Sequence, residues 1–185
     1  MNVHYTAIDG LAVIEPTIFE DQRGYFFESY NERKLAKAMG QSLPRFVQDN
    51  QSKSRHGVLR GLHFQTAPHG QAKLIRAITG EIFDVAVDLR PGSPTYGHWH
   101  GERLSAENRR QFFVPKGFAH GFVVLSEVAE ILYKCDAFYA PESEGALHYN
   151  DPEVAIDWPL PEEALTLSEK DQNGARLKEL TDLRF

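Results

Sequence analysis

Two side chains suited to acid–base and phosphate chemistry stand close together in the segment Gly57–Gln65. His63 is a natural base near neutral pH, and Arg60 lies among apolar residues, where a guanidinium needs an anionic partner such as phosphate. A regular strand would place them on opposite faces, because side chains alternate along a strand. Gly61 between them could form a β-bulge that aims both toward one site. The segment indicates a phosphate-binding arginine beside an imidazole base, with a hydrogen-bonded core histidine as the alternative.

Lys73 and Tyr133 are the other candidates for chemistry, and each has an ordinary structural explanation. Lys73 begins an alternating segment and shares a face with Ile75 and Ala77, so a lysine at a solvated strand end is an adequate interpretation. Tyr133 follows Ile131 and resembles a packing residue whose hydroxyl finds a partner. Neither residue alone distinguishes a site from a packed strand.

The elements that must position these residues are mostly strands. Runs rich in Phe, Val, Ile and Tyr alternate with turn sequences that contain Pro and Gly, and helical patterns are few. Many short strands with few helices predict an all-β fold, a sandwich, jelly roll or barrel with short peripheral helices. The expected strands are Lys73–Ile78, Glu81–Leu89, Gln111–Val114, His120–Leu125 and Glu130–Cys135.

Thr79-Gly80 separates the first two expected strands, and we interpret it as a hairpin turn. The two faces of the second strand differ. One face is wholly apolar and suits a core between two sheets; it comprises Phe83, Val85, Val87 and Leu89. The other face is mixed, and it either lines a ligand cavity or meets solvent; it comprises Ile82, Asp84, Ala86 and Asp88.

Capping residues predict two helices. Asn31 can cap a helix over Glu32–Met39, which Gly40 ends. Ser168, with an aspartate three residues later, has the spacing of a capping box. We expect a second helix to run from there toward Leu180.

Composition narrows the class of protein. The 185 residues contain no repeat or linker, so we expect a single domain over residues 1–185. The net charge of −6 argues against a general attraction to nucleic acid or anionic membrane. One cysteine, no apolar block at the N-terminus and no apolar run long enough for a membrane span favour the cytoplasm.

Several segments, taken together and in order, closely resemble the dTDP-4-dehydrorhamnose 3,5-epimerase family. Any one of them is a weak signal, whereas the set covers nearly the whole chain and is specific. The segments are Asp21–Glu28, Gln48–Asn50, Gly57–Gln65, Pro115–Phe122, Tyr133–Tyr139, Pro141–Gly145, Asn150–Pro152 and Leu167–Asp171.

The resemblance implies a homodimeric jelly roll of the cupin type that uses no metal and no redox cofactor. It makes His63 the general base and Asp171 the carboxylate that orients it, although Asp171 also fits a helix cap. Tyr133 becomes the proton donor on the opposite face of the sugar, and Lys73 lies near the C4 carbonyl oxygen, where enolate charge develops. The implied substrate-binding residues are Arg23, Glu28, Gln48, Asp49, Asn50, Arg60, Lys73, His120, Tyr139, Glu144 and Lys170, with Tyr139 stacking on thymine.

The implied reaction inverts C3 and C5 of dTDP-4-dehydro-6-deoxy-D-glucose to give dTDP-4-dehydro-L-rhamnose, in dTDP-L-rhamnose biosynthesis. A single-centre epimerase or a keto-isomerase acting on the same sugar is the nearest alternative. A binding module without activity would keep Arg60 and Tyr139 but would not need His63, Lys73 and Tyr133 together. A metal-dependent cupin enzyme would need a His-x-His pair near His63, and the pair His98-Trp99-His100 lies in another segment.

Overall fold

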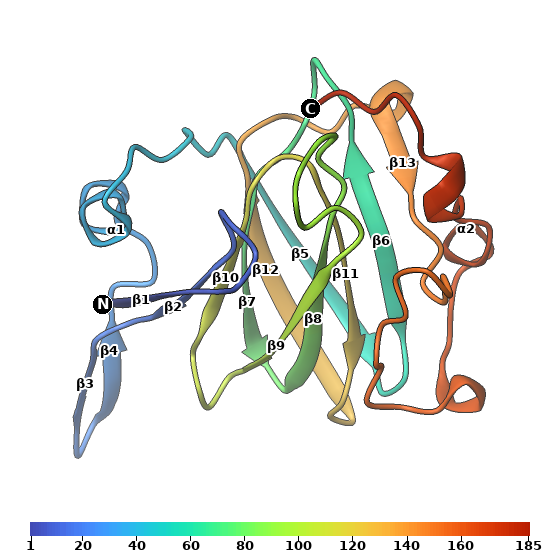
Figure 1. Cartoon of the computed structure of the whole chain (residues 1–185). Helices are drawn as coiled ribbons and strands as arrows, with labels where there is room; N and C mark the ends of the chain where they lie inside the picture. Colours follow the sequence, from blue (N-terminus) through green and yellow to red (C-terminus); the bar gives the residue numbers. More distant parts are fainter.

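Two large antiparallel sheets and a separate hairpin form the computed structural model, which describes all 185 residues (Figure 1). The six-stranded sheet has the order β1 (Asn2–Tyr5), β2 (Ala12–Glu15), β10 (Gln111–Val114), β7 (Lys73–Thr79), β12 (Val128–Cys135) and β5 (Gln48–Arg55). The five-stranded sheet has the order β13 (Glu144–Ala146), β6 (Leu59–Gln65), β11 (Phe118–Val124), β8 (Glu81–Asp88) and β9 (Trp99–Ser105). The hairpin pairs β3 (Ile18–Asp21) with β4 (Gly24–Phe27). This arrangement confirms the predicted all-β, jelly-roll fold.

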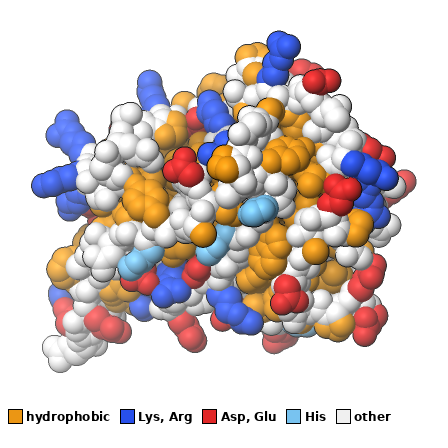
Figure 2. All heavy atoms as spheres, viewed as in Figure 1, with side chains coloured by type: hydrophobic (Ala, Val, Ile, Leu, Met, Phe, Trp, Pro, Cys, Tyr) orange, Lys and Arg blue, Asp and Glu red, His pale blue; other side chains and the backbone are white.

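The helices are short and peripheral, as expected. They are α1 (Glu32–Met39), α2 (Glu169–Gln172) and the 3₁₀ turns η1 (Pro141–Ser143), η2 (Glu162–Ala164) and η3 (Leu177–Glu179). None of these helices has the length and apolar character needed to cross a membrane. Basic and acidic side chains are interspersed over the face shown in Figure 2.

Helix α1 forms where the capping residues predicted it. The Asn31 side chain accepts a hydrogen bond from the amide of Lys34 at 3.1 Å and satisfies a free donor of the first turn. Leu35 and Met39, one turn apart, are buried. Gly40 ends the helix with a left-handed φ of 65°. This helix prediction is confirmed.

The hairpin predicted at Thr79-Gly80 is wrong. Strand β7 pairs with β10 and β12 of the six-stranded sheet, whereas β8 pairs with β11 and β9 of the five-stranded sheet. The chain therefore passes from one sheet to the other at this corner. Gly80 has a φ of 70°, and a Cβ there would lie 2.1 Å from the Val128 carbonyl oxygen. A sheet corner and a hairpin both need a tight glycine turn, so the turn sequence does not specify which strands pair.

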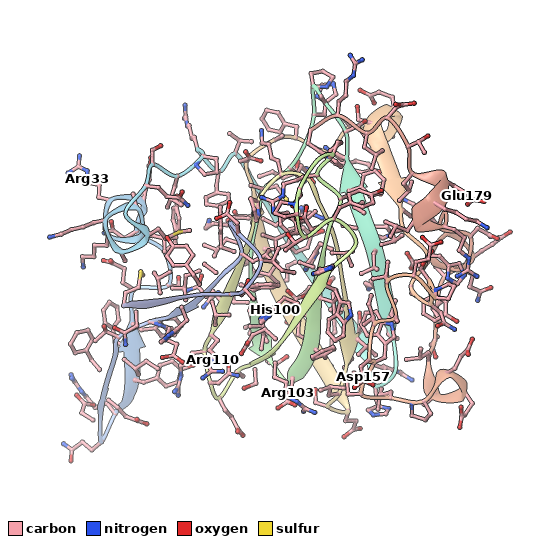
Figure 3. The ribbon with its side chains drawn as sticks, viewed as in Figure 1. Arg33, His100, Arg103, Arg110, Asp157 and Glu179 are labelled. Atoms are coloured by element: carbon pink, nitrogen blue, oxygen red, sulfur yellow. The ribbon has the colours of Figure 1, made fainter.

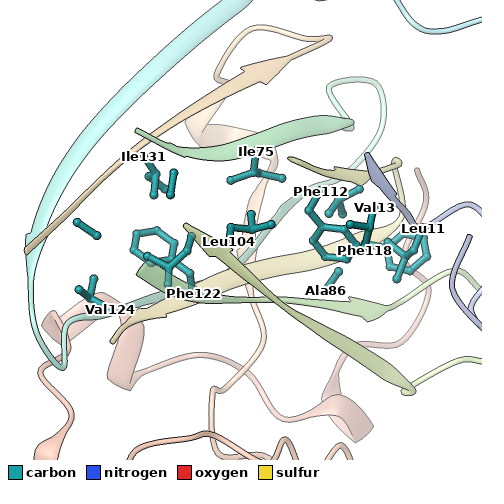
Figure 4. Packing of buried hydrophobic residues seen from close by; sticks show 14 of the residues in the cluster. Leu11, Val13, Ile75, Ala86, Leu104, Phe112, Phe118, Phe122, Val124 and Ile131 are labelled. Atoms are coloured by element: carbon teal, nitrogen blue, oxygen red, sulfur yellow. The ribbon is translucent and has the colours of Figure 1, made fainter. Parts of the chain in front are cut away.

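The mixed face of β8 points toward the other sheet. Ile82 and Ala86 belong to a cluster of 15 buried apolar residues between the sheets. Figure 4 shows the layers of this core, with Ile75 and Ile131 on one side and Leu104 on the other. The solvent-facing interpretation of this face is therefore wrong, because the face is buried in the core between the sheets.

The apolar face of β8 lies outside the sandwich, contrary to prediction. Val85, Val87 and Leu89 pack against the segments that follow β13, including Leu147 and Leu177. The C-terminal part of the chain, on the right in Figure 1, therefore covers the outer surface of the five-stranded sheet. An apolar strand face indicates burial, but it does not identify the covering element.

The C-terminal helix is much shorter than predicted. The Ser168 hydroxyl does accept a hydrogen bond from the amide of Asp171, so the cap is confirmed. The helix stops at Gln172, however, and Ala175 then pairs with Leu147 in a β-bridge. The expected continuation toward Leu180 is wrong because the chain here follows another extended segment.

Candidate functional site

A cavity with two lobes lies between the sheets. His63, Lys73 and Tyr133 line both lobes, whose volumes are about 220 and 300 Å³. The first lobe also has Gln48, Asn50, Gln65, Gln71, Tyr139 and Glu144 in its wall. The second lobe also has Arg60, His120, Lys170 and Asp171 in its wall. The cavity brings together most of the residues that the sequence predicted.

The bulge predicted at Gly61 is present. In the pairing of β6 with β11 the register shifts between His63 and Arg60, so β6 accommodates one extra residue. Gly61 has a φ of 121°, and a Cβ there would lie 2.6 Å from the Cα of Gly121. Both Arg60 and His63 consequently line the second lobe, although a regular strand would separate them.

His63 and Asp171 are hydrogen-bonded partners. The distance from His63 Nε2 to Asp171 Oδ1 is 2.7 Å, and the histidine side chain is 29% exposed. No protein group bonds the Nδ1 atom, so the bond at Nε2 favours the tautomer whose free lone pair lies on Nδ1. The geometry is that of a base held by a carboxylate.

Asp171 is buried and fully engaged. Its Oδ1 also accepts the Gly61 amide at 3.3 Å, and its Oδ2 accepts the Ser168 hydroxyl at 2.7 Å. Burial acts to raise the pKa of Asp171, but the hydrogen bonds from His63 and Ser168 outweigh it and leave the pKa below its usual range. The two interpretations of Asp171, helix cap and histidine partner, describe the same residue, since it lies in the first turn of α2.

Lys73 and Tyr133 stand on the facing sheet. Tyr133 on β12 pairs with Ile75 on β7, and Lys73 pairs with Cys135, so both functional side chains share the inner face. Burial lowers the pKa of Lys73, which Cys135 and Asp84 partly offset. Burial also raises the pKa of Tyr133. The phenol therefore keeps its proton at neutral pH, and the lysine loses its proton more readily than a lysine in water.

His120, which is expected to bind substrate, lies in the wall of the second lobe, and its partner Asp84 is not among the predicted site residues. The distance from His120 Nε2 to Asp84 Oδ1 is 2.9 Å, and both side chains are buried. Burial lowers the pKa of His120, against the effect of Asp84. The signal that could have identified Asp84 is its carboxylate between the apolar residues Ile82 and Ala86 on the mixed face of β8.

The rim of the cavity is a small hydrogen-bonded network. Glu144 Oε2 accepts the Tyr139 hydroxyl at 2.8 Å and the Lys170 ammonium at 2.6 Å. Burial raises the pKa of Glu144, but the bonds from Lys170 and Tyr139 more than reverse this. Gln48 and Asn50, which alternate along β5, face the first lobe. These five predicted residues surround one end of the cavity.

Three predicted binding residues lie outside the cavity of this chain. Asp49 points away between Gln48 and Asn50 and binds Lys134 at 2.9 Å. Arg23, at the turn of the β3–β4 hairpin, binds Asp21 on the same hairpin. Glu28 follows this hairpin and lies 3.1 Å from the ammonium of Lys34.

His98 and His100, the alternative metal-binding pair, lie in different environments. His98 is exposed and precedes β9, whereas His100 packs beside Phe112 and lies 3.8 Å from Glu102. In Figure 3 His100 stands near Arg110, whose guanidinium binds Glu102 at 2.8 Å. No group of three or more His, Cys, Asp or Glu side chains has a spacing that could hold a metal ion.

Comparison with known proteins identifies close relatives. A family model described as dTDP-4-dehydrorhamnose 3,5-epimerase matches residues 5–179. Proteins of that name from Pseudomonas aeruginosa and Salmonella typhimurium are 60% and 53% identical to this chain, over 91% and 92% of both chains. A Legionella pneumophila structure, described as dTDP-6-deoxy-D-glucose-3,5-epimerase in complex with dTDP-4-keto-L-rhamnose, is 52% identical and superposes with a TM-score of 0.92. The alignment covers 100% of this chain and 98% of that chain.

Proposed function

Because the chain belongs to the dTDP-4-dehydrorhamnose 3,5-epimerase family, we propose that its cavity inverts C3 and C5 of dTDP-4-dehydro-6-deoxy-D-glucose. The product is dTDP-4-dehydro-L-rhamnose, in dTDP-L-rhamnose biosynthesis. One observation carries the proposal: an imidazole on one sheet and a phenol on the facing sheet line the same cavity, together with a lysine. Inversion needs a base and an acid on opposite sides of a carbon, and facing sheets provide them.

The C4 ketone of the substrate makes this chemistry accessible. It acidifies the hydrogens on C3 and C5, because the carbanion formed at either carbon is delocalised as an enolate. The base, in our assignment, is Nδ1 of His63, since Nε2 is bound to Asp171. The carboxylate holds the tautomer and stabilises the imidazolium that forms. The ketone is already present, so no hydride carrier or metal enters the proposal.

Lys73 is assigned to the enolate oxygen. Its ammonium would stabilise the oxyanion, and such electrostatic stabilisation is strongest in a site from which water is excluded. Burial, which lowers the pKa of Lys73, also makes it a better proton donor to that oxygen. Tyr133 would then deliver a proton to the carbon from the side opposite His63.

The remaining cavity residues are assigned to the nucleotide. Arg60 and Lys170 offer positive charge to the diphosphate, and the half-exposed ring of Tyr139 offers a stacking surface to thymine. The other proposed binding residues of the cavity are Gln48, Asn50, His120 and Glu144. The enzyme would act in the cytoplasm.

A homodimer would reconcile two predictions that one chain cannot satisfy. Arg23 and Glu28 are expected to bind substrate, yet they lie on or beside the β3–β4 hairpin, outside the cavity. The hairpin projects from the sandwich in Figure 1 and exposes Phe19 and Phe26 by 63% and 69%. We propose that a second copy covers these rings and receives the two charged side chains near its own cavity. Asp49, at the strand edge, is proposed as a contact of the same kind.

Product analysis in D₂O tests the reaction. The enzyme with dTDP-4-dehydro-6-deoxy-D-glucose should give the L-sugar with deuterium at both C3 and C5, observed by proton NMR. Deuterium and inversion at one carbon only would make the chain a single-centre epimerase, and a shifted carbonyl would make it a keto-isomerase.

Tyr133→Phe tests the division between acid and base. The enolate should still form at His63, but it can regain a proton only from the base side, which restores the starting configuration. The variant should therefore introduce deuterium into the substrate while it forms little epimer, provided that the base exchanges with solvent. Tyr96→Phe is a matched control, because the Tyr96 hydroxyl donates to the Leu180 carbonyl, away from the cavity. Epimer formation at the wild-type rate in Tyr133→Phe would contradict the assignment.

A further inference from the structure

The segment 136–140 presents Tyr139 at the mouth of the cavity without belonging to any helix or strand. Phe138 and Tyr139 are 68% and 53% exposed, so burial of their rings does not hold the segment in place. No neighbouring strand bonds the backbone of Ala137, Phe138 or Tyr139. Side chains bind these backbone groups instead.

Gln65 bridges the two residues that flank Tyr139. Its Nε2 donates to the Phe138 carbonyl at 3.3 Å, and its Oε1 accepts the Ala140 amide at 2.9 Å. The same Nε2 donates to the carbonyl of His69 at 2.6 Å. Gln65 is 5% exposed, so these bonds replace the water that its carboxamide has lost.

Two further glutamines bind the neighbouring backbone groups. Gln71 donates from Nε2 to the Ala137 carbonyl at 2.8 Å. Gln48 accepts the Tyr139 amide at Oε1, at 3.0 Å. Three carboxamides from β5, β6 and the segment before β7 thus hold a stretch of chain that has no ladder of its own.

We propose that Gln65, assisted by Gln71, is a positioning residue that fixes the Tyr139 ring for the nucleotide base; we call the pair the glutamine clamp. The inference rests on the proposed stacking of thymine on Tyr139. Only a carboxamide suits the place of Gln65, because one side chain must donate to two carbonyls and accept from an amide. A glutamate at this position would place a carboxylate oxygen, which cannot donate, beside the carbonyl oxygens of Phe138 and His69, and the three oxygens would repel one another.

The clamp acts on binding and not on proton transfer. A loop that is already ordered loses less conformational freedom when the ligand binds. Loosening it should therefore raise KM and weaken dTDP binding, whereas His63 and Asp171, held by β6 and α2, keep their geometry. The expected signature is a change in KM with little change in kcat.

A double-mutant cycle tests whether Gln65 acts through Tyr139. Gln65→Met removes the three bonds and keeps the approximate volume, so dTDP affinity measured by calorimetry should fall about tenfold. In a Tyr139→Ala background the same change should have almost no further effect. Equal losses in both backgrounds would overturn the clamp, because Gln65 would then affect binding without Tyr139.

Hydrogen exchange of the free protein provides a readout that does not depend on the substrate. The Ala140 amide should exchange faster in Gln65→Met, because it loses its bond to Gln65. The Tyr139 amide, bound by Gln48, should follow to a smaller degree as the segment loosens. Gln71→Glu, at a less buried position, should produce the same change to a smaller degree and covers the case in which Gln65→Met does not fold. Unchanged exchange in the folded variants would overturn the proposal.

Gln111→Met is the matched control. Gln111 is 3% exposed and donates one hydrogen bond to the Ser29 carbonyl, outside the cavity. The dTDP affinity and the turnover of the Gln111→Met variant should equal those of the wild type. If the wild-type enzyme is active and the effects of the Gln65 and Tyr139 changes simply add, only the clamp is refuted. If the wild-type enzyme does not convert the proposed substrate, the proposed function is refuted.

Discussion

Two histidine–aspartate pairs lie side by side in this cavity, and they differ in what surrounds them. His63 and His120 are register partners on adjacent strands, and each bonds a carboxylate through Nε2, at 2.7 and 2.9 Å. The His63 side chain is 29% exposed, whereas that of His120 is 7% exposed. The difference in access supports the proposal that His63 is the base, because a base must reach the proton that it removes.

The two carboxylates differ as well. Asp171 binds three groups, from His63, Gly61 and Ser168. Asp84 is fully buried, and its Oδ2 has no hydrogen-bond partner. An unpartnered buried carboxylate oxygen is costly, so it needs an explanation beyond stability. Asp84 acts on the pKa of Lys73, which it raises against the effect of burial. We infer that Asp171 holds His63 as the base, whereas Asp84 helps to keep Lys73 protonated.

The largest effect on turnover should come from changing His63, the more exposed of the two histidines. His63→Asn should reduce turnover by roughly 10²–10⁴-fold, the usual contribution of a positioned acid–base group, while dTDP affinity measured by calorimetry stays within a few-fold. His120→Asn, the same change in the buried pair, should cost less turnover. Equal losses in the two variants would remove the distinction between the pairs.

Asp171→Asn should have the next largest effect. An amide nitrogen facing Nε2 would favour the wrong tautomer, with the proton on Nδ1, and turnover should fall roughly 10²-fold or more. Ser168→Ala is the control, because it removes the helix cap and the two hydrogen bonds between Ser168 and Asp171 but leaves the charge of Asp171. A loss in Asp171→Asn no greater than that in Ser168→Ala would limit Asp171 to a helix cap.

Asp84→Asn should change the pH profile more than the rate. Asp84 raises the pKa of Lys73, so its loss should lower that pKa further, and Lys73 should lose its proton at lower pH. The alkaline limb of kcat should therefore move to lower pH, with a loss at neutral pH well below the roughly 10²-fold expected for the base. An unmoved alkaline limb would contradict the link between Asp84 and Lys73.

The sequence predicted the first of these pairs better than the second. His63 and Arg60 stand in one segment with a glycine between them, so the bulge and the shared cavity follow from local geometry. Asp171 is distant in sequence, and its role came from resemblance to a family. Asp84 was visible only as a carboxylate on a mixed strand face, because its partner His120 lies on another strand.

The errors in the fold have the same origin. Alternation and turn residues predicted β7, β8, β10, β11 and β12 to within a few residues, because both signals are local, but they missed β9 and β13. They did not predict that Thr79-Gly80 joins two sheets, or that the C-terminal segment covers the apolar face of β8. Which strands pair, and which segment covers a strand face, depends on contacts between residues distant in the chain. The alternation of apolar and polar residues along a strand does not encode those contacts.

The smallest effect on activity should come from Asp88→Asn, on the same face of β8 as Asp84. Asp88 is also fully buried, but both of its oxygens are satisfied, by Arg90, Ser93 and Thr95. Although burial acts to raise the pKa of Asp88, these bonds lower it from 3.8 to about 2. Turnover of the variant should stay within about twofold of the wild type, as for a change away from the site.

Its stability should change in a way that depends on pH. A pKa that is lower in the folded state makes the ionised carboxylate stabilising above the unfolded value of 3.8, and the contribution disappears as the pH falls toward 2. Since one pKa unit corresponds to about 1.4 kcal/mol, Asp88→Asn should lower the free energy of unfolding by about 2 kcal/mol at pH 7. Urea unfolding between pH 7 and pH 2 should show this gap narrowing below pH 4. A difference in unfolding free energy that is independent of pH would mean that packing, and not the charge of Asp88, stabilises this end of β8. A large loss of turnover would mean that Asp88, like Asp84, acts on the catalytic cavity.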